Sequence, residues 1–390
     1  MCTIFSLNDE KNAFAGNNED YLDPHTRLWF VPKSGGEING VPWMAGKYAR
    51  NYCGYQNLFP QGGMNEKGLF FDFTAAPPLN VKNQEGKKQW NGTFINFMDF
   101  LTSECATVEE VIKQINTYQA PPQMHEGIFF GDATGDSAII EGETIIRKNS
   151  HFQVSTNFYQ SQIDDPLKIP CERYKIAAQM LEKAEDKVII DTARQVLSAV
   201  HQAGGNCSNV YSQVYDLKKQ IIYLYHFHNF EKVCIINPQD EWAKDKTVIY
   251  DIAELFPPTY AHISFTKKYD FEKSCKQKNI VEKKRAQNEI IILEDSILDS
   301  YTGYYLNENL LDSFNVFRLD DHLILEQNKT IIDLYPTSST SFCIIDVEGE
   351  REVNFETDKN GIVTTMNCEL FLPGWPMTFL KKNKMGYGKR

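Results

Sequence analysis

A cysteine stands second in the chain, directly behind Met1, and a polar cluster follows it after one short hairpin. The chain opens Met1-Cys2-Thr3, and the cluster at residues 16–20 reads Gly-Asn-Asn-Glu-Asp. If Met1 is removed, which aminopeptidases do when the second side chain is small, Cys2 carries both a thiol and a free α-amine. An α-amine with a pKa of about 7.7 to 8.0 is partly neutral at pH 7 and can serve as the base for the thiol. The opening therefore predicts an N-terminal nucleophile, whereas a chain that keeps Met1 leaves Cys2 as a small apolar residue.

The residues around Cys2 predict a β-hairpin that starts at the cysteine and places it at the mouth of a sheet. Apolar runs at 3–7 and 12–16 flank a polar turn, so a β-hairpin begins at Cys2. Strands are also predicted at 68–74, 127–131, 137–141, 144–148, 151–155, 208–215 and 220–227, and helices at 93–103, 107–118, 171–184 and 190–202. Strands in hairpins with helices inserted in blocks predict an α+β fold, in which helices cover an antiparallel sheet.

The length of the chain predicts two domains. A chain of 390 residues is too long for one typical hydrophobic core. We expect a first domain at 1–265 and, where Lys, Gln and Asn dominate, a basic linker at 266–288. Short alternating strands predict an all-β domain at 289–382, as a meander, sandwich or small barrel. Residues 383–390 are predicted to be a disordered basic tail.

Charge and composition exclude several classes of partner. The net charge is −12 and the single basic run lies between Lys267 and Arg285, which argues against nucleic-acid binding. We expect neither a membrane span nor a signal peptide, because the sequence has no apolar run of the needed length and no basic region before an apolar one. Nine cysteines without a CxxC pair are typical of reduced thiols in a cytoplasmic protein.

Five segments in order resemble the choloylglycine hydrolase and penicillin V acylase family of linear amide C–N hydrolases. They are the Met-Cys-Thr opening, the glycine-led cluster at 16–20, GMNEKGL at 63–69, the DATGDS hairpin that leads to Glu141, and the strand that ends in Thr156-Asn157. The resemblance implies an αββα sandwich of the N-terminal nucleophile hydrolase class, with Cys2 at the end of a central strand. It also implies catalysis without a metal or an organic cofactor.

The same resemblance implies roles for individual residues. Cys2 would attack an amide carbonyl, and its α-amine would carry the proton to the leaving nitrogen. Asp20 would accept hydrogen bonds from the amine and the thiol. The side-chain amide of Asn157 and the backbone N–H of Ala75 would stabilise the oxyanion. Relatives carry asparagine near the position of Ala75, but a backbone donor does not depend on the side chain.

Asn17 departs from the pattern of the family, whose bile-acid and penicillin members have arginine at this position. Asparagine can donate a hydrogen bond, but it supplies no charge that would favour a thiolate. We assign Asn17 to the site and expect a cation to approach from elsewhere, with Arg27 and Arg50 as candidates.

Aromatic residues near the proposed site predict an apolar acyl pocket lined by Phe158, Tyr159 and Phe71. The C-terminal β domain resembles the small lipocalin-like module that some serine hydrolases carry. A barrel of about eight strands can hold one small ligand, and a packing or oligomerisation module is the alternative.

The sequence thus predicts a hydrolase that cleaves N-acylated small molecules through a thioester on Cys2. Two alternatives stay open: an acyltransferase of the same fold, and a non-catalytic binder of lipids or small molecules. His226 and His228 lie two apart on a predicted strand and would share a face, but no third metal ligand follows at a suitable spacing. The expected partner is a small-molecule amide, and the sequence leaves open whether the chain forms a homo-oligomer.

Overall fold

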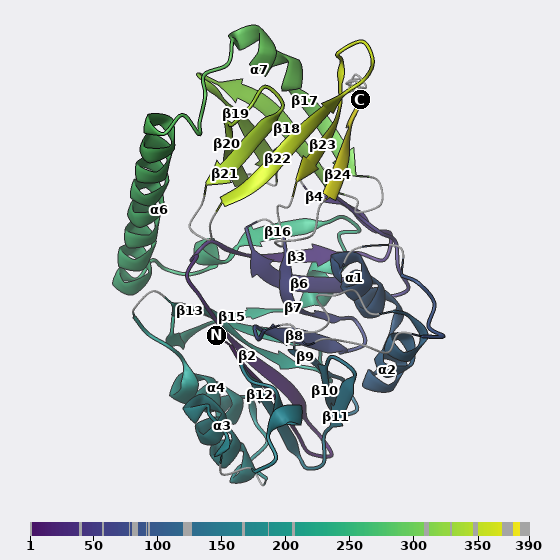
Figure 1. The fold of residues 1–390 in the computed structure, drawn as a ribbon. Coiled ribbons are helices and arrows are strands. Elements are labelled where there is room, and N and C mark those ends of the chain that lie inside the picture. The colour runs from purple at the N-terminus through teal and green to yellow at the C-terminus, as the bar shows by residue number, and fades with distance from the viewer. Residues whose placement is uncertain are drawn as a thin grey trace. The chain divides into compact units, whose positions relative to one another are not determined.

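The computed structural model divides into two compact units. The first comprises Met1–Gly36 and Trp43–Ser264, and the second comprises Glu37–Pro42 and Phe265–Arg390. The residues it describes are 2–38, 41–56, 58–77, 79, 85–90, 92, 94–119, 127–165, 168–185, 187–204, 207–307, 312–327, 330–345, 350–368 and 377–382. Figure 1 shows the elements of both units. The predicted tail at 383–390 lies outside the described residues.

A six-stranded antiparallel sheet in the first unit contains the predicted N-terminal hairpin. Its strand order is β12 (Phe152–Thr156), β1 (Thr3–Asn8), β2 (Ala13–Tyr21), β13 (Ser208–Asp216), β14 (Ile221–His226) and β15 (Asn229–Ile236). Thr3 pairs with Asn18 of β2 on one side and with Thr156 of β12 on the other. Cys2 therefore precedes a central strand, as the hairpin pattern and the resemblance together predicted.

Two helices cover one face of this sheet, α3 (Glu172–Glu182) and α4 (Ile190–Val200). Phe5 and Leu7 of β1 pack in one buried cluster with Leu181 of α3 and Leu197 of α4. Gly16 is required beneath this cluster, because a Cβ there would lie 2.5 Å from the ring of Phe5. The glycine at the head of the polar cluster thus lets β1 and β2 pair under the helices.

An eight-stranded antiparallel sheet forms the rest of the first unit. Its order is β11 (Thr144–Arg147), β10 (Ser137–Glu141), β9 (Gly127–Gly131), β8 (Phe70–Thr74), β7 (Pro60–Asn65), β6 (Arg50–Tyr55), β3 (Thr26–Val31) and β16 (Val248–Asp251). Helices α1 (Phe94–Glu104), α2 (Val108–Thr117) and α5 (Pro238–Trp242) accompany this sheet. A short pair, β4 (Gly36–Ile38) and β5 (Val41–Trp43), forms a separate two-stranded sheet, whose residues Glu37–Pro42 belong to the second unit.

The two large sheets pack face to face. Phe70 of β8 contacts Tyr215 of β13 with ring centroids 5.0 Å apart, and the hydroxyls of Ser6 and Ser137 lie 2.8 Å apart. The other face of the eight-stranded sheet meets α1, where the side chain of Asn65 donates to the carbonyl oxygen of Thr102 at 2.7 Å. The layers therefore run helix, sheet, sheet, helix, and the predicted mixed α and β class is confirmed.

The second unit is built on a closed antiparallel barrel, the last of the three all-β forms that the sequence allowed. Its strands follow in chain order: β17 (Gly303–Asn307), β18 (Asp312–Leu319), β19 (His322–Gln327), β20 (Thr330–Pro336), β21 (Ser341–Ile345), β22 (Glu350–Thr357), β23 (Val363–Cys368) and β24 (Met377–Lys382). The short helix α7 (Asp295–Tyr301) precedes them.

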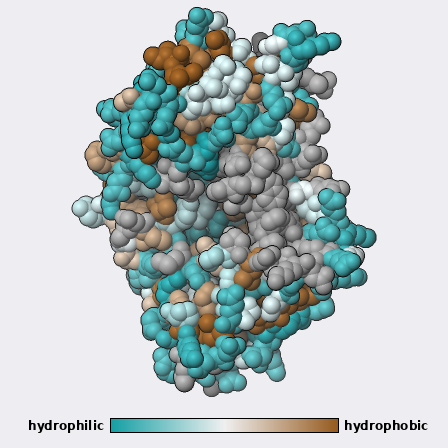
Figure 2. All heavy atoms as spheres, in the orientation of Figure 1, coloured by the Kyte–Doolittle hydropathy of each residue, from teal (hydrophilic) through white to brown (hydrophobic). Residues whose placement is uncertain are grey.

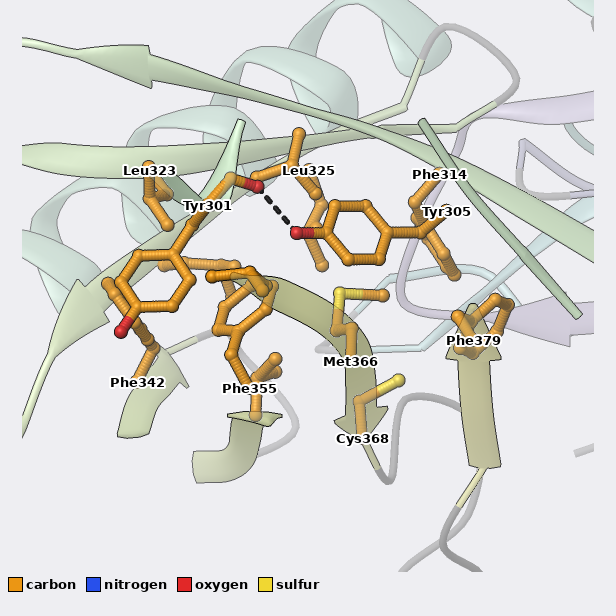
Figure 3. Packing of buried hydrophobic residues seen from close by; sticks show 14 of the residues in the cluster. Tyr301, Tyr305, Phe314, Leu323, Leu325, Phe342, Phe355, Met366, Cys368 and Phe379 are labelled. Atoms are coloured by element: carbon orange, nitrogen blue, oxygen red, sulfur yellow. Dashed lines mark hydrogen bonds between the residues drawn. The ribbon is translucent and has the colours of Figure 1, made fainter. Parts of the chain in front are cut away.

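Large side chains fill the interior of the barrel (Figure 3). The ring of Tyr301 lies tilted against that of Phe355 with centroids 4.6 Å apart, and Phe314 meets Phe379 edge-on at 5.0 Å. The hydroxyl of Tyr305 donates to the carbonyl oxygen of Tyr301 at 2.7 Å, so its buried polar atom is satisfied. An eight-stranded barrel is just wide enough for its own side chains to fill it.

The segment predicted as a basic linker, 266–288, is mostly helical. Helix α6 spans Tyr260–Ala286 and ends in Lys283, Lys284 and Arg285. Lys, Glu and Gln are good helix formers, so the composition that marks a change between domains also supports a helix. Within the second unit, Val281 packs against the buried side chains of Ile290, Tyr335, Cys343 and Ile345.

The visible surface is mainly polar. On the face in Figure 2, the coloured residues are mainly hydrophilic, and the hydrophobic ones lie in small separate groups. No helix among the described residues combines the length and the apolarity needed to cross a bilayer.

Candidate active site

The thiol of Cys2 lies between the two sheets, next to a carboxylate. Cys2 is 4% exposed. Its Sγ donates to Oε2 of Glu19 at 3.5 Å, and the hydroxyl of Tyr55 donates to Oε1 of the same carboxylate at 2.7 Å. Glu19 comes from β2 in one sheet and Tyr55 from β6 in the other. A thiol, a carboxylate and a phenol thus form one hydrogen-bonded row between the two sheets.

Burial determines the protonation states of the hydrogen-bonded groups Cys2 and Glu19. Burial, and next to it the charge of Glu19, raises the pKa of the Cys2 thiol well above its ordinary value. Burial also raises the pKa of Glu19 to about 7, although the hydrogen bond from Tyr55 opposes the rise. At neutral pH the resting thiol therefore keeps its proton, and Glu19 is close to half ionised.

Asp20, which the resemblance assigned to the amine and thiol, lies on the opposite face of β2. Successive side chains of a strand point to opposite faces, so Glu19 takes the hydrogen bond of the thiol, and Asp20 faces the helices. There Oδ2 of Asp20 accepts from Gln202 at 2.8 Å and lies 3.7 Å from a guanidinium nitrogen of Arg173. Burial raises the pKa of Asp20, and the bond from Gln202 opposes this shift.

Asn157 and Ala75, the predicted oxyanion donors, lie side by side. Nδ2 of Asn157 donates to the carbonyl oxygen of Ala75 at 2.9 Å. Oδ1 of Asn157 accepts from Arg173 at 2.9 Å, which fixes the orientation of the amide. The same guanidinium donates to the carbonyl oxygen of Cys2 at 2.6 Å. Arg173, at the start of α3, therefore links the backbone of Cys2 to the side chain of Asn157.

Asn17 lies on the face of Glu19, two residues before it in β2. It is fully buried, and neither polar atom of its side chain has a hydrogen-bond partner among the described residues. The two arginines considered as a replacement cation point elsewhere: Arg27 pairs with Asp251 at 2.9 Å, and Arg50 pairs with Asp99 at 2.5 Å. The cation near the candidate site is Arg173 instead.

A pocket of about 500 Å³ opens on the helix side of the site. Its lining residues include Asn157, Arg173 and Gln202, together with Phe158, Pro170, Cys171, Glu172, Ile176, Ala199, Val200 and His201. Of the three aromatic residues predicted to bind substrate, Phe158 belongs to this lining.

The other two predicted aromatic residues lie in different surroundings. Tyr159 donates its hydroxyl to the carbonyl oxygen of Pro77. Phe71 packs at 6.1 Å from Tyr52 and at 5.4 Å from Phe73, on the face of β8 that meets α1. The alternation of side chains along β8 turns Phe71 away from the face that holds the thiol.

The paired histidines lie in a packed aromatic group. The ring of His226 meets His262 at 4.5 Å and stacks on Phe256 at 5.4 Å. Burial lowers the pKa of His226 to about 3, so the ring is neutral. Across the described part of the chain, no three His, Cys, Asp or Glu side chains are grouped so that they could hold a metal.

Four residues of this site were absent from the sequence-based prediction: Glu19, Tyr55, Arg173 and Gln202. Glu19 could have been found, because a strand from Ala13 onwards places alternate residues on the side of the sheet away from Asp20. The other three come from elements remote in sequence, and no local pattern links them to Cys2.

Comparisons with known proteins support the fold of the first unit. No protein-family model and no curated protein sequence matches the chain. A variant of the conjugated bile acid hydrolase from Clostridium perfringens is similar in structure with a TM-score of 0.54 and 16% identity, over 66% of this chain and 99% of that chain. A second mutant of that hydrolase gives 0.51 and 17%, over 64% and 96%. Penicillin V acylase from Agrobacterium tumefaciens gives 0.44 and 19%, over 58% and 83%. At these identities the first two likenesses establish a shared fold.

Proposed function

We propose that this chain is a hydrolase of linear amide bonds that uses Cys2 as an N-terminal nucleophile after removal of Met1. The observation that carries the proposal is the position of Arg173, which donates both to the carbonyl oxygen of Cys2 and to Oδ1 of Asn157. One rigid guanidinium thereby holds the candidate nucleophile and the candidate oxyanion donor in a fixed relation.

The fold supports the same assignment. The first unit has the layers expected of an N-terminal nucleophile hydrolase, and it shares its fold with a hydrolase of conjugated bile acids. One of the two bile acid hydrolase structures is of a mutant in which the cysteine at position two of that protein is replaced by alanine.

In the proposed reaction, Sγ of Cys2 attacks the amide carbonyl and forms a tetrahedral intermediate. The second hydrogen of the Asn157 amide and the backbone N–H of Ala75 donate to its oxyanion, and Asp20 orients the α-amine. The C–N bond then breaks, the amine leaves with a proton, and water hydrolyses the thioester. An oxyanion donor of this kind contributes about 2.7 to 4 kcal/mol to catalysis.

The pocket beside Asn157, which the thiol of Cys2 does not line, indicates the class of substrate. A volume of about 500 Å³ is suited to a small molecule. Phe158, Ile176 and Val200 offer apolar surface to an acyl group, while Arg173 and Gln202 lie at the end nearest Asp20. We therefore propose an N-acylated small molecule with an apolar acyl group, and the cytoplasm as compartment, since the nine cysteines, all of them described by the structure, form no disulfide.

The packing of the barrel bears on the non-catalytic alternative. Its interior is occupied by the buried cluster around Tyr301, Tyr305 and Phe355. This filling favours a packing module with a lipocalin-like strand order over a barrel that carries a lipid.

The test is an intact-mass measurement of the purified chain before and after exposure to a panel of N-acyl amides. We expect a mature chain that lacks Met1 and that gains one acyl group on its N-terminal peptide. Cys2→Ala should abolish both the adduct and the release of amine. Cys105→Ala, which removes another buried thiol of the first unit, should leave both intact.

A chain that keeps Met1, or that is never acylated, would refute the proposal. The acyltransferase alternative is tested by adding a trial amine to the acylated chain: the exchanged amide is then the product in place of the free acid.

A further inference from the structure

Glu19 is the side chain that accepts the hydrogen bond of the candidate nucleophile, and the reaction proposed so far gives it no role. Its carboxylate is buried, and each oxygen has one partner: Sγ of Cys2 at 3.5 Å and the hydroxyl of Tyr55 at 2.7 Å. A nucleophile, a base within hydrogen-bond reach and a third group that orients the base are the parts of a catalytic triad.

The protonation state of the thiol makes a base necessary. Burial and the charge of Glu19 raise the pKa of Cys2 well above its ordinary value, against the opposing charge of the N-terminal amine, which favours a protonated thiol over a stored thiolate. A thiol is a weak nucleophile unless its proton leaves as the new bond forms. Glu19, with a pKa raised by burial to about 7, is well matched to accept that proton near neutral pH.

We propose that Glu19 takes the proton from the thiol of Cys2 during acylation and that Tyr55 positions its carboxylate, an assignment that rests on the function proposed above. The S–H bond breaks as sulfur bonds to the carbonyl carbon, and the proton passes to Oε2 of Glu19. The α-ammonium of Cys2 protonates the leaving nitrogen as the C–N bond breaks.

Hydrolysis of the thioester restores both groups. Water loses one proton to the α-amine of Cys2 as its oxygen bonds to the carbonyl carbon. The C–S bond then breaks, and sulfur recovers its proton from Glu19. The sum of the steps is amide and water to acid and amine, with no change in the enzyme.

Several titratable groups lie within electrostatic range of Glu19 and enter any pH profile. They are the N-terminal α-amine, the thiols of Cys2, Cys53 and Cys207, the carboxyls of Asp20 and Asp72, and the phenols of Tyr55 and Tyr211. Burial, and next to it the charge of Glu19, raises the pKa of Asp72 well above its ordinary value, which favours the neutral form of this carboxyl. Asp72→Asn therefore serves as a matched control that removes a neighbouring carboxyl without removing a base.

The test compares two rates in Glu19→Gln, which keeps the shape of the side chain and an oxygen for Tyr55. The first is acylation of Cys2 by a 4-nitroanilide with an apolar acyl group, followed as the burst of nitroaniline. The second is alkylation of Cys2 by iodoacetamide at pH 7, followed by the mass of the N-terminal peptide. Alkylation needs a thiolate but no enzymic base.

A base role predicts opposite changes in the two rates. Acylation should fall by about 10²- to 10⁴-fold, the usual contribution of a general base. Alkylation should become faster, because the variant lacks the negative charge that raises the pKa of the thiol. If Glu19 acts only through its charge, both rates should rise, and if it only supports the structure, both should fall.

The pH profile supplies a second readout. In the unaltered protein the acidic limb of kcat/KM should lie near pH 7, and it should vanish in Glu19→Gln. Tyr55→Phe should move this limb to higher pH, since the Tyr55 hydrogen bond lowers the pKa of Glu19. Asp72→Asn should leave the limb in place.

The outcomes distinguish the proposed base role of Glu19 from the proposed amide hydrolase function. Acylation that continues at the unaltered rate in Glu19→Gln would refute the role of Glu19 and leave the amide hydrolase standing. An unaltered chain that never becomes acylated would refute both.

Discussion

Replacement of Arg173 by alanine should slow the proposed reaction more than it weakens substrate binding. The side chain is 16% exposed and lies on the helix side of the six-stranded sheet. It donates to the carbonyl oxygen of Cys2 at 2.6 Å, to Oγ1 of Thr3 at 3.0 Å and to Oδ1 of Asn157 at 2.9 Å. These contacts determine where the amide of Asn157 points, so their loss should affect the transition state.

The expected loss of kcat in Arg173→Ala follows from the contacts that the side chain of Asn157 keeps. Loss of an oxyanion donor costs about 10² to 10³ in kcat, which is the upper limit for freeing Asn157. One of its two side-chain anchors persists, the bond to the carbonyl oxygen of Ala75 at 2.9 Å. We therefore expect kcat to fall roughly 10- to 100-fold, or about 1.4 to 2.7 kcal/mol. Stability should fall by about 1 to 3 kcal/mol, because buried Asp20 loses the cation 3.7 Å away.

The assay is steady-state hydrolysis of an acyl 4-nitroanilide, with kcat and KM determined separately. Arg173→Lys should resemble Arg173→Ala, because an ammonium keeps the charge but cannot bond to Cys2 and Asn157 in one plane. In a chain that already carries Asn157→Ala, the further change Arg173→Ala should cause no additional loss of kcat. The double variant should therefore be no slower than Asn157→Ala alone. Arg194→Ala, which removes a surface arginine of α4, should change neither constant. Additive losses in the double variant would refute the argument that Arg173 acts through Asn157.

Two further predictions concern stability. Asp99→Ala should lower the free energy of unfolding in urea by about 3 to 5 kcal/mol, since it leaves the fully buried Arg50 without its carboxylate; a loss below about 1 kcal/mol would contradict this reasoning. The hydrogen bond with Asp333 is the chief reason why the pKa of His322 is raised in the folded protein. The contribution of this bond to the free energy of unfolding is therefore fully present below the ordinary pKa of about 6.5, and it is lost as pH rises through the higher folded value. Melts of the chain across this range should show that loss in the second unit, and His322→Gln should remove it.

The strands that could be predicted from the sequence are those in which a short apolar run lies between clear turns. The hairpin of β1 and β2 and the pair of β9 and β10 are of this kind. β6 and β7 were missed because their sequences, RNYCGY and PQGGMN, are rich in glycine and polar residues. Glycine is needed there for close approach: a Cβ on Gly54 would lie 2.1 Å from the carbonyl oxygen of Phe59, and one on Gly62 would lie 2.2 Å from Oδ2 of Asp72. These segments form strands because of packing between neighbouring strands, and a scale of strand propensity does not include that packing.

Some residues of the candidate site could likewise be predicted from the sequence, and others could not. Cys2, Asn157 and Ala75 could be placed together because each stands at the end of a predictable strand. Arg173 could not, since it is one arginine on an amphipathic helix and its contacts are with residues 16 to 171 positions away. Such a contact is determined by how α3 lies on the sheet, which local periodicity does not reveal.

The asparagine at position 17 and the glutamate at position 19 are best understood together. Both lie on the face of β2 that carries the thiol, whereas Arg173 lies on the other face. An arginine at position 17 would hold Glu19 ionised at all relevant pH values and would favour a stored thiolate. A neutral amide has a donor and an acceptor, so Asn17 is compatible with either protonation state of Glu19. Without a fixed cation, Glu19 can both gain and lose a proton near pH 7, and the proposed base must do each once in every turnover. In the proposed reaction, Asn17 leaves no positive charge beside the thiol to stabilise a thiolate, and the neighbouring carboxylate of Glu19 would instead accept the proton at the moment of attack.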